Sequence, residues 1–592
     1  MTKLSDYVID FIVREKVRHI FEMIGGAITH LLDSAHGRRD IACVSMHHEQ
    51  AAAFAAEAYA RMNGRLGVAM ATSGPGSLNM ITPIGSCYFD SVPCLFITGQ
   101  VNTYEYKFDR PIRQIGFQET DIVSVVRPIV KYAELVRKPE DIRYCLEKAV
   151  FLARSGRPGP ALLDIPMNVQ RAQIDPKKLR SFYGSAEHRR LAAPRPVSAA
   201  AISKITALIK AARRPVILAG GGVRTAGATD ELADLVKKTG IPVVCSLMGL
   251  DSVDHGSRCF TGMIGSYGNR YGNMTLANCD LLLILGSRLD TRQTGARTGT
   301  FARGAKKVHV DIDANELGAK IKTDVAVRAD VKAFLKRLNA ALPRNGQDLS
   351  GWYSVIDGYR ESFPEVETAE EPGGINPNRF MQLLSKYTRP GDIISVDVGQ
   401  NQMWAAQSLR LKKGQRMLIS GGMGSMGFAL PAAIGAALAC PGRRVLAVCG
   451  DGGIQVNIQD MDSLAVRRLP VKLILMNNGC LGMVRQFQDL YFEGRRQSTL
   501  VGYNCPDLKK IIAAYGVPGR AVTGMKQAGA GLRAALAAKG PALLEVKLTR
   551  ETAVEPKLEF NKPIEDMSPN MPREKLRRAM IVAPLPENDE KK

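Results

Sequence analysis

Residues 445–478, VLAVCGDGGIQVNIQDMDSLAVRRLPVKLILMNN, contain two apolar, strand-like runs separated by a helical one. A crossover helix of this kind joins parallel strands, whose carboxyl ends share one edge of a sheet. In α/β proteins this edge is where ligands bind. We therefore expect Asp451 and Asn478 to lie together there. The glycines beside them leave room for a phosphate to approach the backbone: Gly450, Gly452 and Gly453.

The carboxylate of Asp451 and the amide oxygen of Asn478 are hard oxygen ligands of the kind that Mg²⁺ shares with phosphates. The stretch therefore predicts a metal–diphosphate clamp. The alternative is an ordinary turn at a strand edge, followed by asparagines that occur there by chance.

The same alternation of strand-like and helix-like runs predicts an α/β fold of three domains, each a mainly parallel sheet flanked by helices. The expected domains span residues 1–185, 197–342 and 377–550. Polar stretches at 181–196 and 344–376 are expected to be linkers. Residues 551–592 are Pro-rich and charged, and we expect an irregular tail that covers the surface or is partly disordered.

Composition places the chain among ordinary globular proteins, because 45% of its residues are hydrophobic and 23% are charged. A length of 592 residues is too great for a single core. No apolar run is long enough to span a membrane. The N-terminal MTKLSDYVIDFIVREKV predicts an amphipathic helix and no signal peptide. Eleven cysteines without metal-ligand spacing indicate reduced thiols and a cytoplasmic protein.

A net charge of +23 could attract nucleic acid, an anionic membrane or phosphorylated substrates. The basic residues are dispersed, and their tightest groups, Arg189 with Arg190 and Arg577 with Arg578, lack interleaved aromatic residues. We therefore expect no nucleic-acid or membrane partner, and an anionic substrate or a basic surface instead.

MHHEQAAAFAAEAYARMNG places Glu49 after the apolar run 41–46 and at the start of an alanine-rich helix. A carboxylate at such a strand-to-helix edge is a candidate for a ligand site, although an isolated glutamate there could be purely structural. Glu57 is spaced to pair with Arg61 one helical turn later, and we expect it on a solvated helix face.

At this point the chain resembles the acetolactate synthase (acetohydroxyacid synthase) large-subunit family of thiamine diphosphate (ThDP) enzymes. GDG followed by NN is the ThDP signature, and the resemblance covers essentially residues 1–550. The matching motifs, in order, are MHHEQAAAFAAEAYAR, TSGPGSLN, FQETD, RPGPALLDIP, SLMGL, RLDTRQTG, VDID, VGQNQMWAAQ, GGMGSMGFALPAAIGA, GDGGIQVNIQD and MNNGCLGMVRQFQ. The resemblance implies a pyrimidine-binding, a central FAD/nucleotide-binding-like and a diphosphate-binding domain.

ThDP needs a carboxylate at its pyrimidine N1′, so that its 4′-amino group can deprotonate C2. The resemblance gives this role to Glu49, and the role of a wedge that bends the cofactor to Met426. Phe117 and Gln118 would face the thiazolium and the substrate. Mg²⁺ would be held by Asp451, Asn478 and the carbonyl of Cys480. Further implied cofactor contacts are Gly26, Pro75, Asn79, Val398, Gly399, Gln400, Asn401, Gly424, Gly450, Gly452, Gly453, Leu481, Gly482 and Met483.

The central domain resembles the family's FAD-binding segments, in which FAD has no redox role and which some members leave without FAD. The implied contacts are Gly220, Gly221, Gly222, Met263, Arg288, Asp290, Arg292, Asp311, Asp313 and Asp330. Separately, residues 422–427 match GxGxxG, which alone would suggest a Rossmann dinucleotide site. Pro431, four residues after the last glycine, and the ThDP motifs favour a ThDP-binding loop over a Rossmann site.

Departures from the family pattern gather where the acceptor substrate is selected. Phe487 stands where the family has a tryptophan that favours 2-ketobutyrate, and Ser266 stands where it has a methionine. Arg292, which the resemblance implies would hold the acceptor carboxylate, is kept. Three further replacements are Met167 for lysine, and Tyr267 and Asn401 for histidine. The cofactor side is therefore conventional and the acceptor side altered.

The resemblance implies an enzyme that decarboxylates pyruvate and transfers the two-carbon unit to a ketone. With a second pyruvate the product is 2-acetolactate. Three segments instead resemble relatives from surface-polysaccharide clusters, which add a pyruvate-derived acetyl group to a CDP-linked 4-keto-dideoxy sugar on the way to a branched sugar: RQIGFQETDIVS, GMVRQFQDLYFEGRRQST and KPIEDMSPNMP. Other ThDP-dependent decarboxylases or lyases, a nucleotide-binding oxidoreductase and a non-enzymatic scaffold are the remaining alternatives.

The family places Glu49 and the clamp on different chains. The resemblance therefore implies a homodimer or homotetramer with active sites across the interface, and it leaves room for a regulatory subunit.

Overall fold

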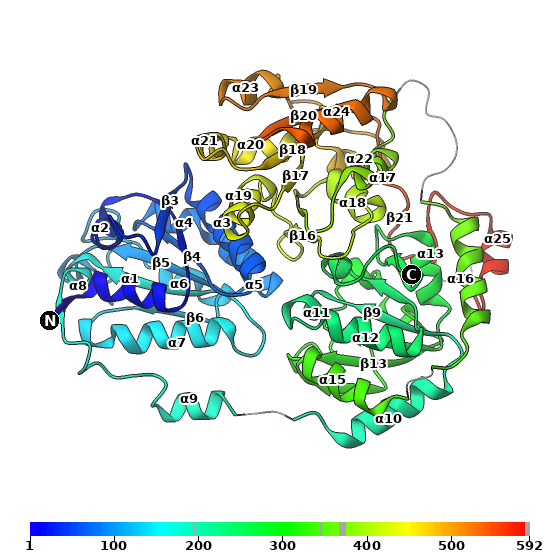
Figure 1. The fold of residues 1–592 in the computed structure, drawn as a ribbon, viewed down its shortest axis with the longest axis horizontal. Coiled ribbons are helices and arrows are strands. Elements are labelled where there is room, and N and C mark those ends of the chain that lie inside the picture. The colour runs from blue at the N-terminus through cyan, green and yellow to red at the C-terminus, as the bar shows by residue number, and fades with distance from the viewer. Residues whose placement is uncertain (194–195, 344–345, 366–373, 586–592) are drawn as a thin grey trace.

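The computed structural model describes residues 1–193, 196–343, 346–365 and 374–585. They form three domains, each built on a six-stranded sheet flanked by helices (Figure 1). Every strand pair within these three sheets is parallel. The expected α/β class is therefore confirmed.

The first sheet has the order β3-β2-β4-β5-β7-β6. Its strands are β2 His19–Met23, β3 Ala42–Ser45, β4 Gly67–Ala71, β5 Cys94–Gln100, β6 Tyr132–Leu135 and β7 Ala161–Pro166. Its main helices are α1 Leu4–Arg14, α2 Thr29–Ala35, α3 Glu49–Asn63, α4 Pro75–Asn79, α5 Ile81–Asp90, α6 Ile122–Val126 and α7 Ile142–Arg154. The helix α1 confirms the amphipathic N-terminal segment.

The second sheet has the order β11-β10-β9-β12-β13-β14. Its strands are β9 Pro215–Ala219, β10 Val243–Cys245, β11 Phe260–Met263, β12 Leu281–Leu285, β13 Lys306–Asp311 and β14 Val325–Arg328. The helices around it are α10 Ala199–Ala211, α11 Gly221–Thr225, α12 Thr229–Thr239, α13 Arg270–Ala277, α14 Thr291–Thr294 and α15 Val331–Ala341.

The third sheet has the order β16-β15-β17-β18-β20-β19. Its strands are β15 Ile393–Val396, β16 Arg416–Ile419, β17 Val445–Gly450, β18 Val471–Asn477, β19 Gly519–Val522 and β20 Ala542–Lys547. Its helices are α17 Pro377–Tyr387, α18 Gln400–Ser408, α19 Ala429–Ala439, α20 Asp451–Val456, α21 Met461–Val466, α22 Gly482–Tyr491, α23 Leu508–Ala514 and α24 Met525–Ala537.

The crossover in the decisive stretch is confirmed, with β17 and β18 in parallel register from Val445 opposite Val471 to Gly450 opposite Met476. The expected single helix is divided into α20 and α21 at Asn457, which lies outside helical geometry at φ −128°. The side chain of Asn457 donates a hydrogen bond to the carbonyl of Gly427, 2.8 Å away. This bond ties the crossover to the loop that precedes α19.

Helices α3 and α19 pack against each other where the first and third domains meet (Figure 1). Gly435 allows the close approach, because a Cβ there would lie 2.0 Å from the carbonyl oxygen of Ala55. Near the other end, the guanidinium of Arg61 lies 5.8 Å from the ring centroid of Phe428. The two helices are therefore antiparallel, so that the start of α3 and the start of α19 lie at opposite ends of the pair.

The expectation that Glu57 is solvated is wrong, although its pairing with Arg61 is confirmed. Glu57 is fully buried, because the polar side of α3 faces the third domain instead of water. Arg61 also donates to Asp90 at 2.9 Å and to the carbonyl of Ile419 at 2.7 Å. Burial raises the pKa of Glu57 to about 7 despite these neighbours.

The expected linker at 344–376 is wrong in its central part, which is a helix, α16 Ser350–Ser362, that buries Trp352, Tyr353 and Ile356. These residues recur at helical spacing within a polar segment, and the composition of the segment hid them. Within the linker at 181–196, α9 spans Ala186–Leu191. Residues 194–195, 344–345 and 366–373, which include most of the glutamate- and glycine-containing turn, lie outside the described residues.

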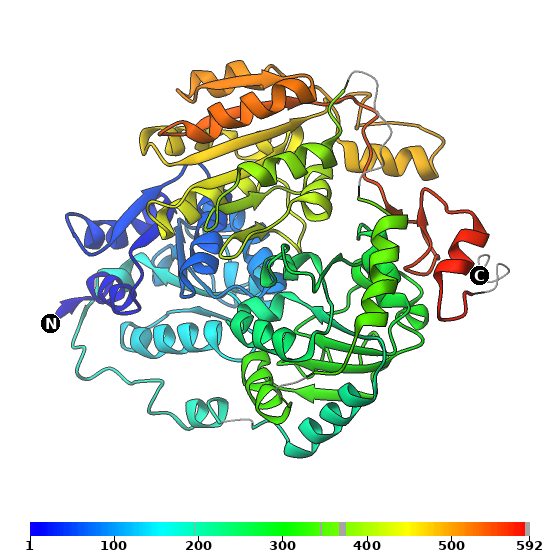
Figure 2. The same ribbon diagram turned by 45° about the vertical axis from the view of Figure 1, so that its right-hand side comes forward.

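The tail is more regular than expected, with β21 Lys557–Leu558, β22 Met567–Ser568 and α25 Arg573–Ala579. It packs against the central domain (Figure 2), where Ile564 and Met567 are fully buried. Arg303 of that domain forms a 2.7 Å ion pair with Glu565. Apolar residues spaced through a charged segment thus anchor the tail; residues 586–592 lie outside the described part.

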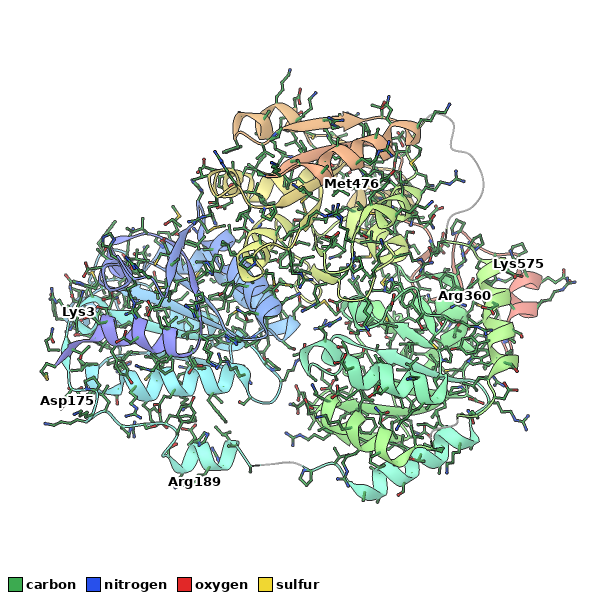
Figure 3. The ribbon with its side chains drawn as sticks, viewed as in Figure 1. Lys3, Asp175, Arg189, Arg360, Met476 and Lys575 are labelled. Carbon is green, nitrogen blue, oxygen red and sulfur yellow. The ribbon has the colours of Figure 1, made fainter. Side chains whose placement is uncertain are left out.

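Within the described residues, no helix is long and apolar enough to cross a membrane. All eleven cysteines are free, and most are buried. Charged side chains are spread over the periphery, as Lys3, Asp175, Arg189 and Lys575 illustrate in Figure 3.

Candidate active site

The proposed metal ligands meet at the carboxyl edge of the third sheet, where β17 and β18 end. Met476, which is labelled in Figure 3, belongs to the last part of β18. The outer atom of the Asn478 amide lies 2.9 Å from the carbonyl oxygen of Cys480 and 3.2 Å from Oδ1 of Asp451. Asp451 and Asn478 come from adjacent parallel strands, and Cys480 follows in the same turn. The sequence-based grouping is therefore reproduced by the geometry.

The neighbours of Gln400 decide which atom of the Asn478 amide faces this cluster. Gln400 Nε2 donates to the carbonyl of Thr552 at 3.0 Å and to Gln486 Oε1 at 3.2 Å. Gln400 Oε1 is thereby left as an acceptor, and Asn478 Nδ2 donates to it at 2.9 Å. Asn478 consequently presents its oxygen to the carbonyl of Cys480 and the carboxylate of Asp451.

Three oxygen atoms that face one another without an intervening proton repel each other unless a cation lies between them. Their chemistry fits Mg²⁺, which favours one or two carboxylates and other hard oxygens next to a phosphate. Burial raises the pKa of Asp451, which is 2% exposed, and a bound cation would reverse that effect. The hydroxyl of Tyr503 donates to Asp451 Oδ2 at 2.7 Å. No sequence signal pointed to Tyr503.

Glycines around the clamp keep backbone and side chains close together. A Cβ on Gly482 would lie 2.0 Å from Gln400 Oε1, so this position excludes larger residues. A Cβ on Gly452 would meet Leu481 at 2.6 Å and Met426 at 3.2 Å. The proposed wedge Met426 therefore lies next to the clamp and is 37% exposed.

Asp397 is a structural part of the site that the motifs did not reveal. It follows β15 and is 1% exposed. Its carboxylate accepts hydrogen bonds from the backbone N–H groups of Gly427 at 3.0 Å and Ala429 at 2.9 Å. Burial raises its pKa to about 6. The glycines at 422–427 thus form a loop fastened to the strand end, and a polar residue directly after an apolar strand was the available signal.

The other predicted cofactor contacts of this domain surround the same edge. Asn401 Nδ2 donates to the carbonyl of Asp397 at 2.8 Å, and its Oδ1 would lie 3.1 Å from a Cβ on Gly450. Gly424 has a φ of +67° and open space around it. Val398 and Gly399 lie in the turn before α18, Gly453 lies in the first turn of α20, and Met483 lies at the start of α22.

Glu49 opens α3 and is 7% exposed. Its Oε2 accepts a hydrogen bond from Asn79 Nδ2 at 3.0 Å, and its Oε1 would lie 3.0 Å from a Cβ on Gly76. Helix α4, which begins at Pro75, is thereby placed next to the carboxylate. Gly26 begins a short 3-10 helix, Gly26–Ile28, after β2, and a Cβ there would meet no neighbouring atom within 4 Å.

Phe117 and Gln118 lie on an exposed loop of the first domain. Phe117 is 87% exposed, which is unusual for a large aromatic residue. Gln118 has a φ of +63°, and its Cβ abuts Gly74, which has a φ of +62°. Such strained conformations outside glycine gather at functional sites. Glu119 fixes the loop by accepting from the N–H groups of Lys107 at 2.8 Å and Ile115 at 2.7 Å.

Within one chain, the carboxylate and the clamp are apart. Glu49 starts α3, whereas Met426 precedes α19, and the antiparallel packing puts these two starts at opposite ends of the helix pair. Exposed apolar side chains occur on the first domain at Ile24, Leu78, Ile112, Ile115 and Phe117, and on the third domain around the segment that precedes α19 at Met423, Met426 and Val456.

A cavity of about 1160 Å³ lies between the central domain and its two neighbours. Its wall contains most of the predicted FAD contacts, namely Gly221, Gly222, Met263, Arg288, Asp290, Arg292, Asp311 and Asp330. Gly220 and Asp313 are not on this wall. Gly220 instead packs against Gly286, and Asp313 faces Arg157 at 3.7 Å. The volume and the arginines suit a dinucleotide with a diphosphate.

The predicted acceptor residues come together at the outer end of the site. Ser266 donates its N–H to the carbonyl of Arg292 at 2.7 Å, and its own carbonyl accepts from Leu558 N–H at 2.7 Å. Phe487 on α22 packs against Tyr491 with ring centroids 4.9 Å apart. Lys557 of the tail also reaches this place, which the sequence analysis missed because the tail was expected to be irregular.

Comparisons with known proteins agree with this arrangement. Three models of thiamine pyrophosphate enzymes match the chain in order: the N-terminal TPP binding domain at residues 2–125, the central domain at 202–338 and the C-terminal TPP binding domain at 397–546. The fold and the site thus define a ThDP enzyme.

Full-length relatives narrow the class. "Probable acetolactate synthase 2, chloroplastic" of Oryza sativa is 37% identical over 584 residues, 95% of this chain and 86% of the relative. "Acetolactate synthase large subunit" of Parasynechococcus marenigrum is 38% identical over 552 residues, 92% of this chain and 87% of the relative. "Acetolactate synthase, chloroplastic" of Arabidopsis thaliana is 38% identical over 558 residues, 92% and 81% respectively. The chain belongs to the acetolactate synthase family.

Proposed function

We propose that this protein decarboxylates pyruvate and joins the remaining two-carbon unit to the keto carbon of a second pyruvate, giving 2-acetolactate and CO₂. The observation that carries this proposal is the oxygen cluster of Asp451, Asn478 and Cys480. These oxygens repel each other unless a cation lies between them, and Mg²⁺ held in this way is shared with a phosphate group such as the diphosphate of ThDP. Sequence relatives named acetolactate synthases support the choice of reaction.

The residues divide the work by position. Asp451, Asn478 and the Cys480 carbonyl would hold Mg²⁺, and the glycines beside them would admit the diphosphate. ThDP, when bound, supplies a thiazolium that accepts the electrons left when CO₂ departs. The Glu49 carboxylate keeps one oxygen on Asn79 and has the other free to take and return a proton at its own atom. Met426 would bend the cofactor, and Phe117 with Gln118 would cover the reacting carbon.

We expect at least a dimer, because Glu49 and the clamp lie at opposite ends of the α3–α19 pair and only a second copy can bring them together. The exposed apolar residues beside both ends support this interface. Sedimentation of the active enzyme tests it, since an active monomer would contradict a shared site. A tetramer and a regulatory subunit are compatible with this interface.

FAD would occupy the arginine-lined cavity of the central domain without a redox role. Its release in acid and fluorescence measurement would test this part of the proposal. The domain limits 1–185, 197–342 and 377–550 and a cytoplasmic location, which the free cysteines favour, stay predictions.

A different acceptor is the second candidate, favoured by Phe487 and the altered residues around Ser266. That acceptor would be a bulkier ketone, such as a keto sugar linked to a nucleoside diphosphate.

The decisive experiment incubates the purified protein with ThDP, Mg²⁺ and pyruvate and identifies the products by mass spectrometry. Formation of 2-acetolactate supports the first candidate. Acetaldehyde alone would indicate a simple decarboxylase. Release of CO₂ with products only when another ketone is added would favour the second candidate.

A further inference from the structure

Three segments that are distant in the sequence meet at the acceptor end of the site. Leu558 of β21 is bonded through its N–H to the carbonyl of Ser266, and Ser266 N–H is bonded to the carbonyl of Arg292, both at 2.7 Å. The tail is also attached to α22, because Gln486 Nε2 donates to the carbonyl of Val554 at 2.9 Å and Gln486 Oε1 accepts from its N–H at 2.9 Å. Together these hydrogen bonds fix the position of Lys557 relative to Arg292.

Lys557 is a buried cation in an aromatic environment. The residue is 7% exposed, and its Nζ lies 5.7 Å from the ring centroid of Phe487 and 5.3 Å from that of Tyr491. The ring centroid of Phe560 lies 5.0 Å from that of Tyr491, so that the aromatic cluster contains the rings of Phe487, Tyr491 and Phe560. Within the described residues, the ammonium group has no hydrogen bond or ion pair.

The nearest acidic residue does not neutralise it. Glu559 influences Lys557 electrostatically, but its carboxylate is paired with Lys562 at 3.4 Å. Burial and the positive charge of Arg292 lower the pKa of Lys557. Packing alone does not need this charge, since a methionine would cover the same rings without desolvating an ammonium group.

Arg292 supplies the second cation at the same place. Its guanidinium lies 5.7 Å from the ring centroid of Tyr267, and it is exposed on the wall of the large cavity. Lys557 and Arg292 are two positive charges that repel each other. The rings of Tyr267, Phe487 and Tyr491 flank them. An anion bound between the two cations would remove this repulsion. A single carboxylate, as in pyruvate, can occupy only one of them fully.

Building on the proposed function, we propose that Lys557 is a specificity-determining residue that binds a second anionic group of the acceptor, the first being held by Arg292. The acceptor class is then a ketone with two anionic groups, such as a 2-oxo dicarboxylate or a diphosphate-linked keto sugar. Pyruvate serves as donor and as a poorer acceptor.

The test is a competition between acceptors in the holoenzyme. Protein with ThDP and Mg²⁺ is given pyruvate, 2-oxobutanoate (2-ketobutyrate) and one doubly charged ketone at equal concentrations. The products are quantified by mass spectrometry. The doubly charged ketones are 2-oxoglutarate and a nucleoside-diphosphate-linked keto sugar. The product ratio reports relative kcat/KM and does not depend on the amount of active enzyme.

The variants are Lys557→Met, which keeps the apolar packing, and Lys557→Arg, which keeps the charge. We expect one doubly charged ketone to compete better than 2-oxobutanoate in the wild type. Lys557→Met should lower that product ratio about ten- to a hundredfold, the value of a hydrogen bond to a charged group. Lys557→Arg should retain most of it. Lys575→Met is the matched control, because Lys575 is on the same tail and lies 5.1 Å from the ring centroid of Phe363, but it donates to the carbonyl of Ser362 instead of facing Arg292.

An unchanged ratio in Lys557→Met, an equal loss in Lys575→Met, or a wild type that never prefers a doubly charged ketone over 2-oxobutanoate would each overturn the role of Lys557. Formation of acetolactate in any of these cases would leave the proposed function intact. Absence of every carbon–carbon bonded product in the wild type would instead defeat the proposed function itself.

Discussion

The clamp and the acceptor end of the site are built in opposite ways. The clamp draws Asp451, Asn478 and Cys480 from a single strand–helix–strand unit, so that chain connectivity alone brings them together. The acceptor end draws Arg292, Phe487 and Lys557 from the central domain, α22 and the tail. We expect a substitution in the clamp to impair the whole cofactor site, because its ligands belong to one connected unit. At the acceptor end the residues come from separate segments, and one of them can be substituted while the others keep their positions. The difference predicts larger effects from substitutions in the clamp.

The largest effect is expected for Asp451→Ala, which removes the charged ligand from the oxygen cluster. Mg²⁺-dependent ThDP binding should be abolished, as measured by calorimetric titration. The matched control is Asp462→Ala in the same crossover, because the Asp462 side chain is 49% exposed and faces His47 at 3.6 Å instead of the clamp. Near-native ThDP affinity in Asp451→Ala would contradict the larger effect that we expect from substitutions in the clamp.

Glu49→Gln should retain ThDP binding but lower turnover by about 10²–10⁴-fold, because the amide can still hydrogen-bond but cannot exchange a proton. Steady-state rates at saturating ThDP measure this. Asn79→Ala removes the hydrogen bond to Oε2 and should have a smaller effect. If Glu49→Gln turned over at the wild-type rate, the carboxylate would have no part in the chemistry.

Asp397→Asn tests the support beneath the clamp. An amide can accept from Gly427 N–H but turns a second donor toward Ala429 N–H, so the loop at 422–427 should loosen. We expect ThDP affinity to fall about 10- to 100-fold, as for other groups that orient metal ligands. Unchanged affinity would show that the loop is held by packing alone.

The same residue gives a pH dependence of stability. Burial raises the pKa of Asp397 from 3.8 to about 6, so the folded protein binds this proton more tightly than the unfolded chain does. The contribution therefore stabilises the fold at low pH and is lost as the pH rises from about 4 to about 6. Urea unfolding of the cofactor-free protein across this range should show the decline in the wild type and a flatter profile in Asp397→Asn.

The smallest effect is expected for Phe487→Trp at the acceptor end. An indole fills more of the space beside Tyr491 and Phe560, and contacts of this size are worth about 1–3 kcal/mol. Preference for 2-ketobutyrate over pyruvate should rise modestly if the acceptor is a 2-oxo acid. A bulkier acceptor would be crowded, and its turnover should fall. A strong preference for 2-ketobutyrate already in the wild type would contradict an altered acceptor site.

Sequence alone determined the three parallel α/β units, the clamp and the position of Glu49, because each depends on strand and helix periodicity within a short stretch. The ladder between β17 and β18 and the helix start at Glu49 follow directly from such local patterns. Tertiary structure decided what depends on contacts between distant segments. It buried Glu57 against the third domain, folded α16 out of an apparent linker and brought Lys557 onto the rings of α22. Burial is a property of what packs against a residue, and local periodicity does not specify that partner.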